Sequence, residues 1–96
     1  MRLDDKDRIS MDECRIRALR YLAKQVKDRF ASASDVGNAI WPNSEMRAQG
    51  LGGAASRVLK TLQRDGLAKW GVDGTWWGWL ITPAGRKKAL EGRNER

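Results

Sequence analysis

The chain has no histidine and only one cysteine among its 96 residues. Without histidine it lacks the commonest general base and the commonest zinc ligand. The lone Cys14 excludes an internal disulfide and a cysteine-based metal site, and we expect it as a small apolar residue on a helix face. No glycine-rich loop ends in the Lys-Ser/Thr pair that holds phosphate and magnesium. We therefore expect a protein that is not an enzyme, with no metal and no cofactor.

Long apolar runs are also missing. No stretch approaches the ~20 apolar residues of a membrane span, and the charged start MRLDDKDR is not followed by the apolar segment of a secretory signal. We therefore expect a cytoplasmic protein that does not bind a membrane. A chain of 96 residues suits one domain. We predict a flexible charged N-terminus over residues 1–9, a domain over 10–91 and a frayed tail over 92–96.

Positive charge is abundant and unevenly placed. The formal net charge is +7 and the isoelectric point is about 10.2. Residues 1–13 hold three cations and five acids, a balance of −2, so the remaining residues carry +9. A basic body of this size favours a polyanionic partner, nucleic acid first. A soluble basic surface without a specific partner is the alternative that composition leaves open.

Three segments have helical patterns. SMDE, from Ser10 to Glu13, has the form of a capping box and predicts a helix over about 11–29. Its apolar stripe is Met11, Cys14, Ala18, Leu19, Leu22, Val26 and Phe30, and its other side is basic. Ser32 or Ser34 caps a short helix with Val36, Ala39 and Ile40 inward, and Pro42 ends it. The third helix is expected over AASRVLKTLQR, residues 54–64, with Ala55, Val58, Leu59 and Leu62 inward.

Glycines mark both ends of this third helix. Gly66 is expected in the left-handed conformation after the helix, with Leu67 completing a Schellman motif against Leu62. Before the helix, PNSEMRAQGLGG is expected as a loop or a frayed helix start. The glycines of GLGG, residues 50–53, have two interpretations. They let the backbone near the helix N-terminus approach a phosphate, or they form an irregular turn between helices.

WGVDGTWWGW, residues 70–79, holds four of the five tryptophans. Asp73-Gly74 is the dipeptide of a two-residue type I′ hairpin turn, which predicts Trp70 opposite Trp77 and Ala68 opposite Trp79. The two faces are then Ala68, Trp70, Trp77, Trp79 and Ile81 on one side, and Lys69, Trp76 and Leu80 on the other. Thr82 and Pro83 begin a last helix, with Ala84 and Leu90 inward and Arg86, Lys87 and Lys88 outward.

ASDVGNAIW, ASRVLKTLQRDGLAKW and WLITPAG together resemble the winged helix-turn-helix domain, over about residues 10–90. The resemblance implies a mostly α fold with a small β-hairpin (α+β), in the order helix-helix-helix-hairpin-helix. It implies double-stranded DNA binding, with the third helix in the major groove and the wing near the backbone or minor groove. The chain also resembles small bacterial and phage winged-helix proteins, and this likeness implies a transcription regulator or a phage or mobile-element accessory protein.

The DNA-binding candidates are Arg47, Gln49, Ser56, Arg57, Lys60, Thr61, Arg64 and Lys69. We expect Arg57 to contact guanine and Gln49 to contact adenine, while Lys60, Thr61, Arg64 and Lys69 contact phosphates. A solvated helix side without a partner is the alternative. The predicted wing tip departs from the family, because residues 72–75 hold no cation and one acid.

The tryptophans have three interpretations: core, a platform for stacking bases, or a surface for another protein. We expect Trp41 and Trp79 in the core. Trp70, Trp76 and Trp77 are candidate interface residues, in a homodimer or with a protein partner. Stacking on unpaired bases is less favoured, because a two-stranded ribbon is a poor platform for successive bases.

Overall fold

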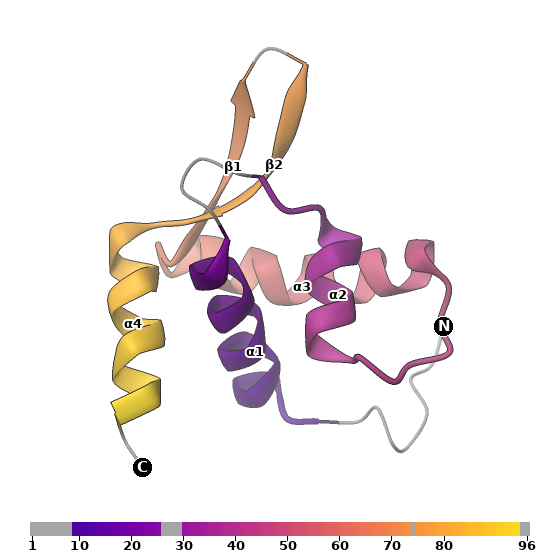
Figure 1. The fold of residues 1–96 in the computed structure, drawn as a ribbon, viewed down its shortest axis with the longest axis horizontal. Coiled ribbons are helices and arrows are strands. Elements are labelled where there is room, and N and C mark those ends of the chain that lie inside the picture. Colours follow the sequence, from indigo (N-terminus) through magenta and orange to yellow (C-terminus); the bar gives the residue numbers. More distant parts are fainter. Residues whose placement is uncertain (1–8, 26–29, 74, 95–96) are drawn as a thin grey trace.

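The structure is a computed structural model that describes residues 9–25, 30–73 and 75–94. Its elements are α1 (Met11–Lys24), α2 (Ala33–Ile40), α3 (Ala48–Arg64), β1 (Ala68–Asp73), β2 (Trp76–Ile81) and α4 (Pro83–Asn94). The fold is mostly helical with one small antiparallel hairpin, which confirms the expected class and element order (Figure 1). The flexible N-terminus predicted over residues 1–9 lies outside the described residues except for Ile9.

Helix α1 begins as the sequence predicts, since the Ser10 hydroxyl accepts from the Glu13 amide at 3.1 Å. Cys14, Ala18, Leu19 and Leu22 are buried, as expected. Two details differ. Met11 is exposed, because it lies in the first turn at the very end of the stripe. The helix ends at Lys24 instead of residue 29, and Gln25 is extended; Val26 lies outside the described residues.

Helix α2 is capped by Ser32 and not by Ser34. The Ser32 hydroxyl accepts from the Asp35 amide at 3.1 Å, and the Asp35 carboxylate accepts from the Ser32 amide at 3.4 Å. Val36 and Ile40 are fully buried. Trp41 follows as the C-cap residue and is also buried, which confirms it as a core residue.

Helix α3 begins at Ala48, six residues before the predicted start at Ala54, so GLGG is helical. Of the two interpretations of GLGG, the irregular turn is therefore wrong. Of its glycines, Gly50 lies in the first turn, where amides lack helical partners. Close packing explains the glycines at position 37 of α2 and position 52 of α3. A Cβ on Gly37 of α2 would lie 2.8 Å from the Leu51 carbonyl oxygen, and one on Gly52 would lie 3.1 Å from Ser34 Oγ.

The end of α3 agrees with the sequence. Gly66 has φ 75°, the Leu67 amide donates to the Leu62 carbonyl at 2.8 Å, and the Gly66 amide donates to the Gln63 carbonyl at 3.0 Å. These two bonds are the Schellman pattern. They turn the chain sharply from α3 into β1, so the hairpin starts beside the C-terminal end of α3.

The hairpin register differs from the prediction by two residues. Trp70 faces Trp79, Val72 faces Trp77 and Asp73 faces Trp76, so Asp73 belongs to the strand. Gly74, the second residue of the predicted turn, lies outside the described residues. Because the shift is even, the predicted division of side chains between the two faces is kept. The tryptophan pair is therefore Trp70 with Trp79, whose ring centroids lie 5.4 Å apart in an edge-to-face arrangement.

A segment before α2 explains this register. Ala31 and Trp79 exchange both backbone hydrogen bonds, at 3.1 and 2.8 Å, so Trp79 directs its polar groups away from β1. The predicted register would have bonded Trp79 to Ala68 instead. The observed register also places Gly71 opposite Gly78, and the Phe30 side chain lies against both; a Cβ on Gly71 would be 2.6 Å from Phe30 Cε1.

Helix α4 is capped as predicted, with the Thr82 hydroxyl accepting from the Gly85 amide at 3.0 Å. Its inward side is different. Gly85 and Ala89 are buried, whereas Ala84 and Leu90 are exposed. The reason is close approach, because any side chain at position 85 would overlap the Leu67 carbonyl. The expected outward side, Arg86 to Lys88, is exposed.

Candidate nucleic-acid interface

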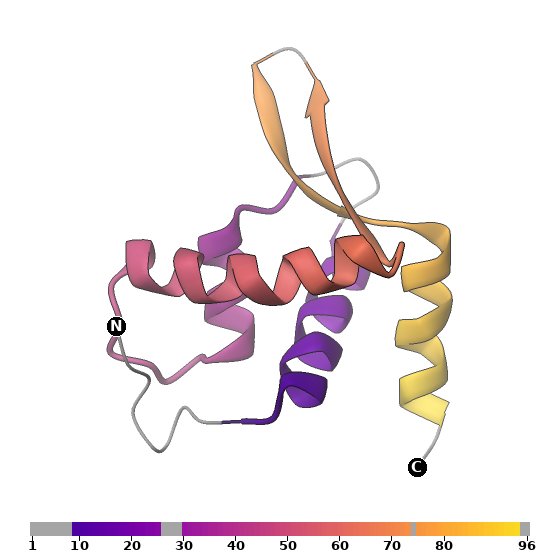
Figure 2. The same cartoon turned by 180° about the vertical axis from the view of Figure 1, so that it is seen from behind.

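One side of α3 is polar, basic and uncovered. Its apolar residues, spaced by three and four, are buried against the rest of the protein: Leu51, Ala55, Val58, Leu59 and Leu62. The same spacing places another set on the opposite side, namely Gln49, Gly53, Ser56, Arg57, Lys60 and Arg64. All of these are exposed except Ser56, which is partly buried. Figure 2 shows α3 running along the near side of the molecule, in front of α1 and α2.

Cations extend this surface beyond the middle of α3. Arg47 is the N-cap residue, is exposed and makes no capping hydrogen bond. The following first turn presents amides that the helix leaves without carbonyl partners, a favourable place for an anion. At the other end, Lys69 is exposed on β1. The predicted cations Arg47, Arg57, Lys60, Arg64 and Lys69 are therefore all accessible to a polyanion.

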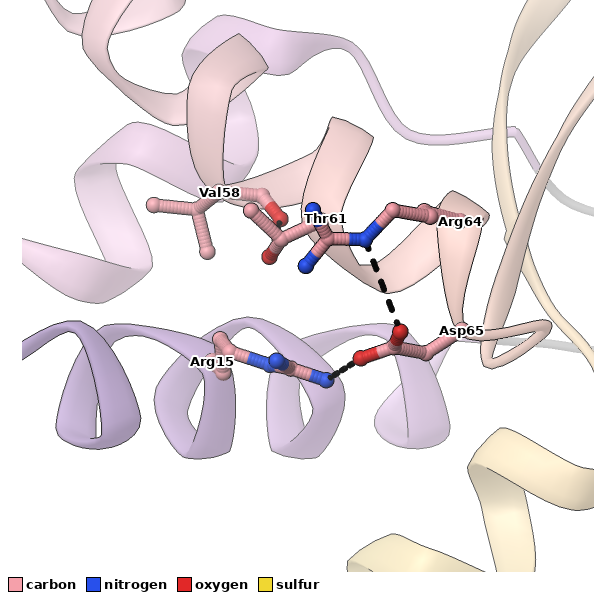
Figure 3. A network of polar contacts seen from close by, with 5 residues as sticks. All are labelled: Arg15, Val58, Thr61, Arg64 and Asp65. Atoms are coloured by element: carbon pink, nitrogen blue, oxygen red, sulfur yellow. Dashed lines mark hydrogen bonds and ion pairs between the residues drawn. The ribbon is translucent and has the colours of Figure 1, made fainter.

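The acidic residue Asp65 lowers the positive charge at the C-terminal end of α3. Asp65 pairs with Arg15 of α1 and lies with its Oδ1 3.7 Å from Arg64 Nε (Figure 3). The hydrogen bond from Arg15 holds the pKa of the Asp65 carboxyl below its ordinary range, and the charges of Arg15 and Arg64 act in the same direction. The side chain of Arg64 remains 75% exposed. Sequence reasoning did not identify Arg15 and Asp65, which are fifty residues apart.

The two hydroxyl residues on α3 are less accessible than the cations. Thr61 is partly buried, and its hydroxyl donates to the Val58 carbonyl at 2.6 Å (Figure 3). A phosphate needs a donor, so this bond would have to break before Thr61 could contact one. Ser56 is partly buried on the same helix. The cations and Gln49 are the candidates that the structure leaves most open.

The tryptophans divide between core and surface. Trp41 and Trp79 are buried, as expected. Trp70 is 47% exposed and Trp77 is 63% exposed, and Val72, on the same face, is 67% exposed. Trp76 lies in β2, but its side chain is outside what the structure describes. In Figure 1 the outer half of the hairpin projects beyond the helices, which explains why they do not cover this face.

The described residues contain no cluster of three or more His, Cys, Asp or Glu that could hold a metal ion. Cys14 is buried, and burial raises the pKa of its thiol above the ordinary value. In the same part of the chain, no helix has the length and apolar character needed to cross a membrane. Comparison with protein-family models, curated proteins and solved structures gave no match to this chain.

Proposed function

We propose that this protein is a winged helix-turn-helix module that binds double-stranded DNA, with α3 in the major groove. The observation that carries the proposal is the outward side of α3, where Arg57, Lys60 and Arg64 are exposed and no described element covers them. A major groove about 12 Å wide accepts one helix, and guanidinium and ammonium groups suit its phosphate rims and guanine edges. A small transcription regulator or accessory protein of bacterial or phage type fits this activity.

The proposed contacts differ along the helix. Arg57 lies near the middle of α3 and is the candidate for a bidentate contact to guanine, and Gln49 is the candidate for adenine. Lys60, Arg64 and Lys69 lie toward the hairpin and suit phosphates, which fix position and affinity without selecting sequence. Arg47 and the amides of the first turn suit a phosphate at the other end of the helix.

The hairpin has a smaller part in this proposal than a wing usually has. The described side chains on its outer half are uncharged, namely Trp70, Val72, Thr75 and Trp77. An uncharged face does not attract phosphates, so α3 and its ends must supply most of the electrostatic attraction. We accordingly propose that the binding energy depends on α3 more than on the hairpin tip.

A matched pair of variants tests the proposal by fluorescence anisotropy on random-sequence duplex DNA. Lys60→Gln and Lys87→Gln each remove one charge from an exposed helical position, on α3 and α4 respectively. With about five phosphate contacts, log K of the wild type should fall against log salt with a slope of about −4 to −5. Lys60→Gln should reduce the slope by about 1 and weaken binding severalfold, whereas Lys87→Gln should change both much less.

Two outcomes would contradict this function. One is the absence of wild-type binding to any duplex at low salt. The other is equal weakening by Lys60→Gln and Lys87→Gln, which would mean that only total charge matters. Selection of bound sequences from a random duplex library, repeated with Arg57→Ala, tests the base contact separately. Loss of a guanine preference in that variant is the expected result, because alanine has no donor for guanine O6 and N7.

A further inference from the structure

The outer edge of β1 presents unpaired backbone groups. In an antiparallel sheet the N–H and C=O of one residue point to the same side, and neighbouring residues alternate. The backbone N–H and C=O of Trp79 are both bonded to Ala31 and therefore point away from β1. The residues of β2 whose backbone groups point toward β1 are the neighbours of Trp79, Gly78 and Leu80. Their partners Gly71 and Lys69 therefore face β2. Trp70 and Val72, which alternate with them, must direct their N–H and C=O groups outward.

Among the described residues of β1, the outward N–H and C=O groups are accessible at Trp70 and Val72. β1 has a single neighbouring strand, and no backbone hydrogen bond to Trp70 or Val72 from another element is present among the described residues. Ala68 also points outward but is buried at the base of the hairpin. Trp70 and Val72 are exposed, and their side chains share a face with the exposed Trp77. The free edge and the apolar face thus coincide in the outer half of the hairpin.

From this arrangement we infer that two copies of the chain pair through the outer edges of β1, antiparallel and related by a two-fold axis at Gly71. In this register Trp70 of each copy lies opposite Val72 of the other, so each accessible outward residue meets another accessible one. Four backbone hydrogen bonds form, together with two cross-strand contacts between an aromatic and a β-branched side chain, a favourable combination. If the two-fold axis lay at Trp70, Val72 would have to pair with the buried Ala68. If it lay at Val72, the two Val72 residues would face each other and fewer of the outward residues would pair.

Charge favours a second copy over nucleic acid at this edge. Trp70, Val72 and Trp77 are uncharged, whereas the chain as a whole carries +7. A phosphate backbone gains nothing from this uncharged face, whereas two copies of a basic protein meet on it without bringing cations together. Lys69, the cation of β1, belongs to the other face of the hairpin. Few residues of each copy meet in this contact, compared with the roughly 20–30 per partner of a standard interface, so we expect a dissociation constant on the order of 10–1,000 µM.

The test uses Val72→Pro with Val72→Thr as its matched control. Proline at position 72 removes an outward N–H that the hairpin does not use, so the fold should survive while pairing is blocked. Threonine keeps both the amide and the β-branched shape. Sedimentation velocity should show mass rising with concentration for the wild type and Val72→Thr, and a monomer for Val72→Pro. Added salt should strengthen the dimer, because it screens repulsion between the copies.

Amide hydrogen exchange of the wild type gives a second measurement that needs no variant. Protection of the Trp70 and Val72 amides should rise with protein concentration, whereas the Lys69 and Gly71 amides should be protected at every concentration. A wild type that remains monomeric up to about 1 mM would overturn the proposal, since even a weak interface assembles there. Equal self-association of Val72→Pro would also overturn it, as would quenching of tryptophan emission by single-stranded DNA without self-association.

This inference stands apart from DNA binding. DNA affinity measured at nanomolar protein, far below the dimer dissociation constant, should be the same for the wild type and Val72→Pro. Salt also acts oppositely on the two interactions, since it weakens DNA binding and strengthens the dimer. Failure of one proposal is therefore recognisable while the other holds.

Discussion

Asp65 shows how one residue can serve both the fold and the proposed interface. It links the end of α3 to α1 through Arg15, and it lies beside Arg64 on the side proposed to meet DNA. The carboxylate is surface-exposed, so its pair with Arg15 is screened by solvent and contributes modestly to stability. Its value lies in fixing the end of α3 relative to α1.

Asp65→Asn should lower the free energy of unfolding at neutral pH but not in acid. The carboxyl has a pKa below 3.8 in the folded protein because Arg15 binds its charged form, and an ordinary pKa in the unfolded chain. A depressed folded pKa stabilises the protein above the unfolded value, and this stabilisation disappears as the pH falls through the folded value. Urea unfolding at pH 7 and well below pH 3.8 measures the difference between wild type and variant.

The control for this prediction is Arg15→Gln, alone and combined with Asp65→Asn. If the two side chains act as a pair, the double variant should be little less stable at pH 7 than either single variant. Additive losses would show that Asp65 acts through something other than Arg15.

At the scale of elements, α2 and α3 pack closely because glycines at their contact leave room for the neighbouring backbone and side chains, and apolar side chains pack around them. Gly37 lets α2 approach the backbone of α3 at Leu51, and Gly52 lies against Ser34. Glycine within a helix costs about 0.5–1 kcal/mol relative to alanine, so its use here needs a compensating contact. The buried Val36, Ile40 and Leu59 supply that contact.

Gly37→Ala and Gly53→Ala should therefore have opposite effects on stability. A Cβ at position 37 would lie 2.8 Å from the Leu51 carbonyl oxygen, and we expect a loss of about 1–3 kcal/mol. A Cβ at position 53 would meet nothing within 4 Å, and we expect a gain of about 0.5–1 kcal/mol. Urea unfolding measures both, and a destabilising Gly53→Ala would contradict the helical assignment of GLGG.

At the scale of the whole molecule, the hairpin is joined to the helices by the segment before α2. Ala31 forms backbone hydrogen bonds with Trp79 at the edge of β2 that faces away from β1, while the Phe30 side chain packs on the paired glycines Gly71 and Gly78. This joint determines which part of the hairpin is held against the body and which part projects. Trp70 pairs with Trp79 at this joint and Trp77 lies farther along the hairpin; both are exposed.

Phe30→Ala and Gly71→Ala should each destabilise the protein, but together they should partly compensate. Loss of the half-buried ring should cost about 1–3 kcal/mol, less than for a fully buried Phe. The Cβ of Gly71→Ala would lie 2.6 Å from the ring of Phe30. In the double variant that Cβ occupies vacated space, so urea unfolding should give a favourable coupling energy. Purely additive losses would mean that Phe30 does not pack on the glycines.

The sequence alone determined the elements whose signals are local. The caps at Ser10 and Thr82, the glycine stop at Gly66 and the alternation of the hairpin faces all depend on residues close together in the chain. The outward cations of α3, Arg57, Lys60 and Arg64, followed from the same helical period that buried its leucines. Short-range geometry is enough for these, because caps and periodicity act within one or two turns.

Only the tertiary structure decided features that depend on contacts between distant segments. The start of α3 was left open by the sequence, and the hairpin register and the inward side of α4 were predicted wrongly. Contacts from distant segments bear on all three: Gly37 of α2 packs on Leu51, Ala31 bonds to Trp79, and Leu67 lies against Gly85. The pairing of Arg15 with Asp65 has no local signal for the same reason. A turn dipeptide or a glycine run determines which backbone conformations are allowed. Packing between distant segments selects which of these conformations is adopted.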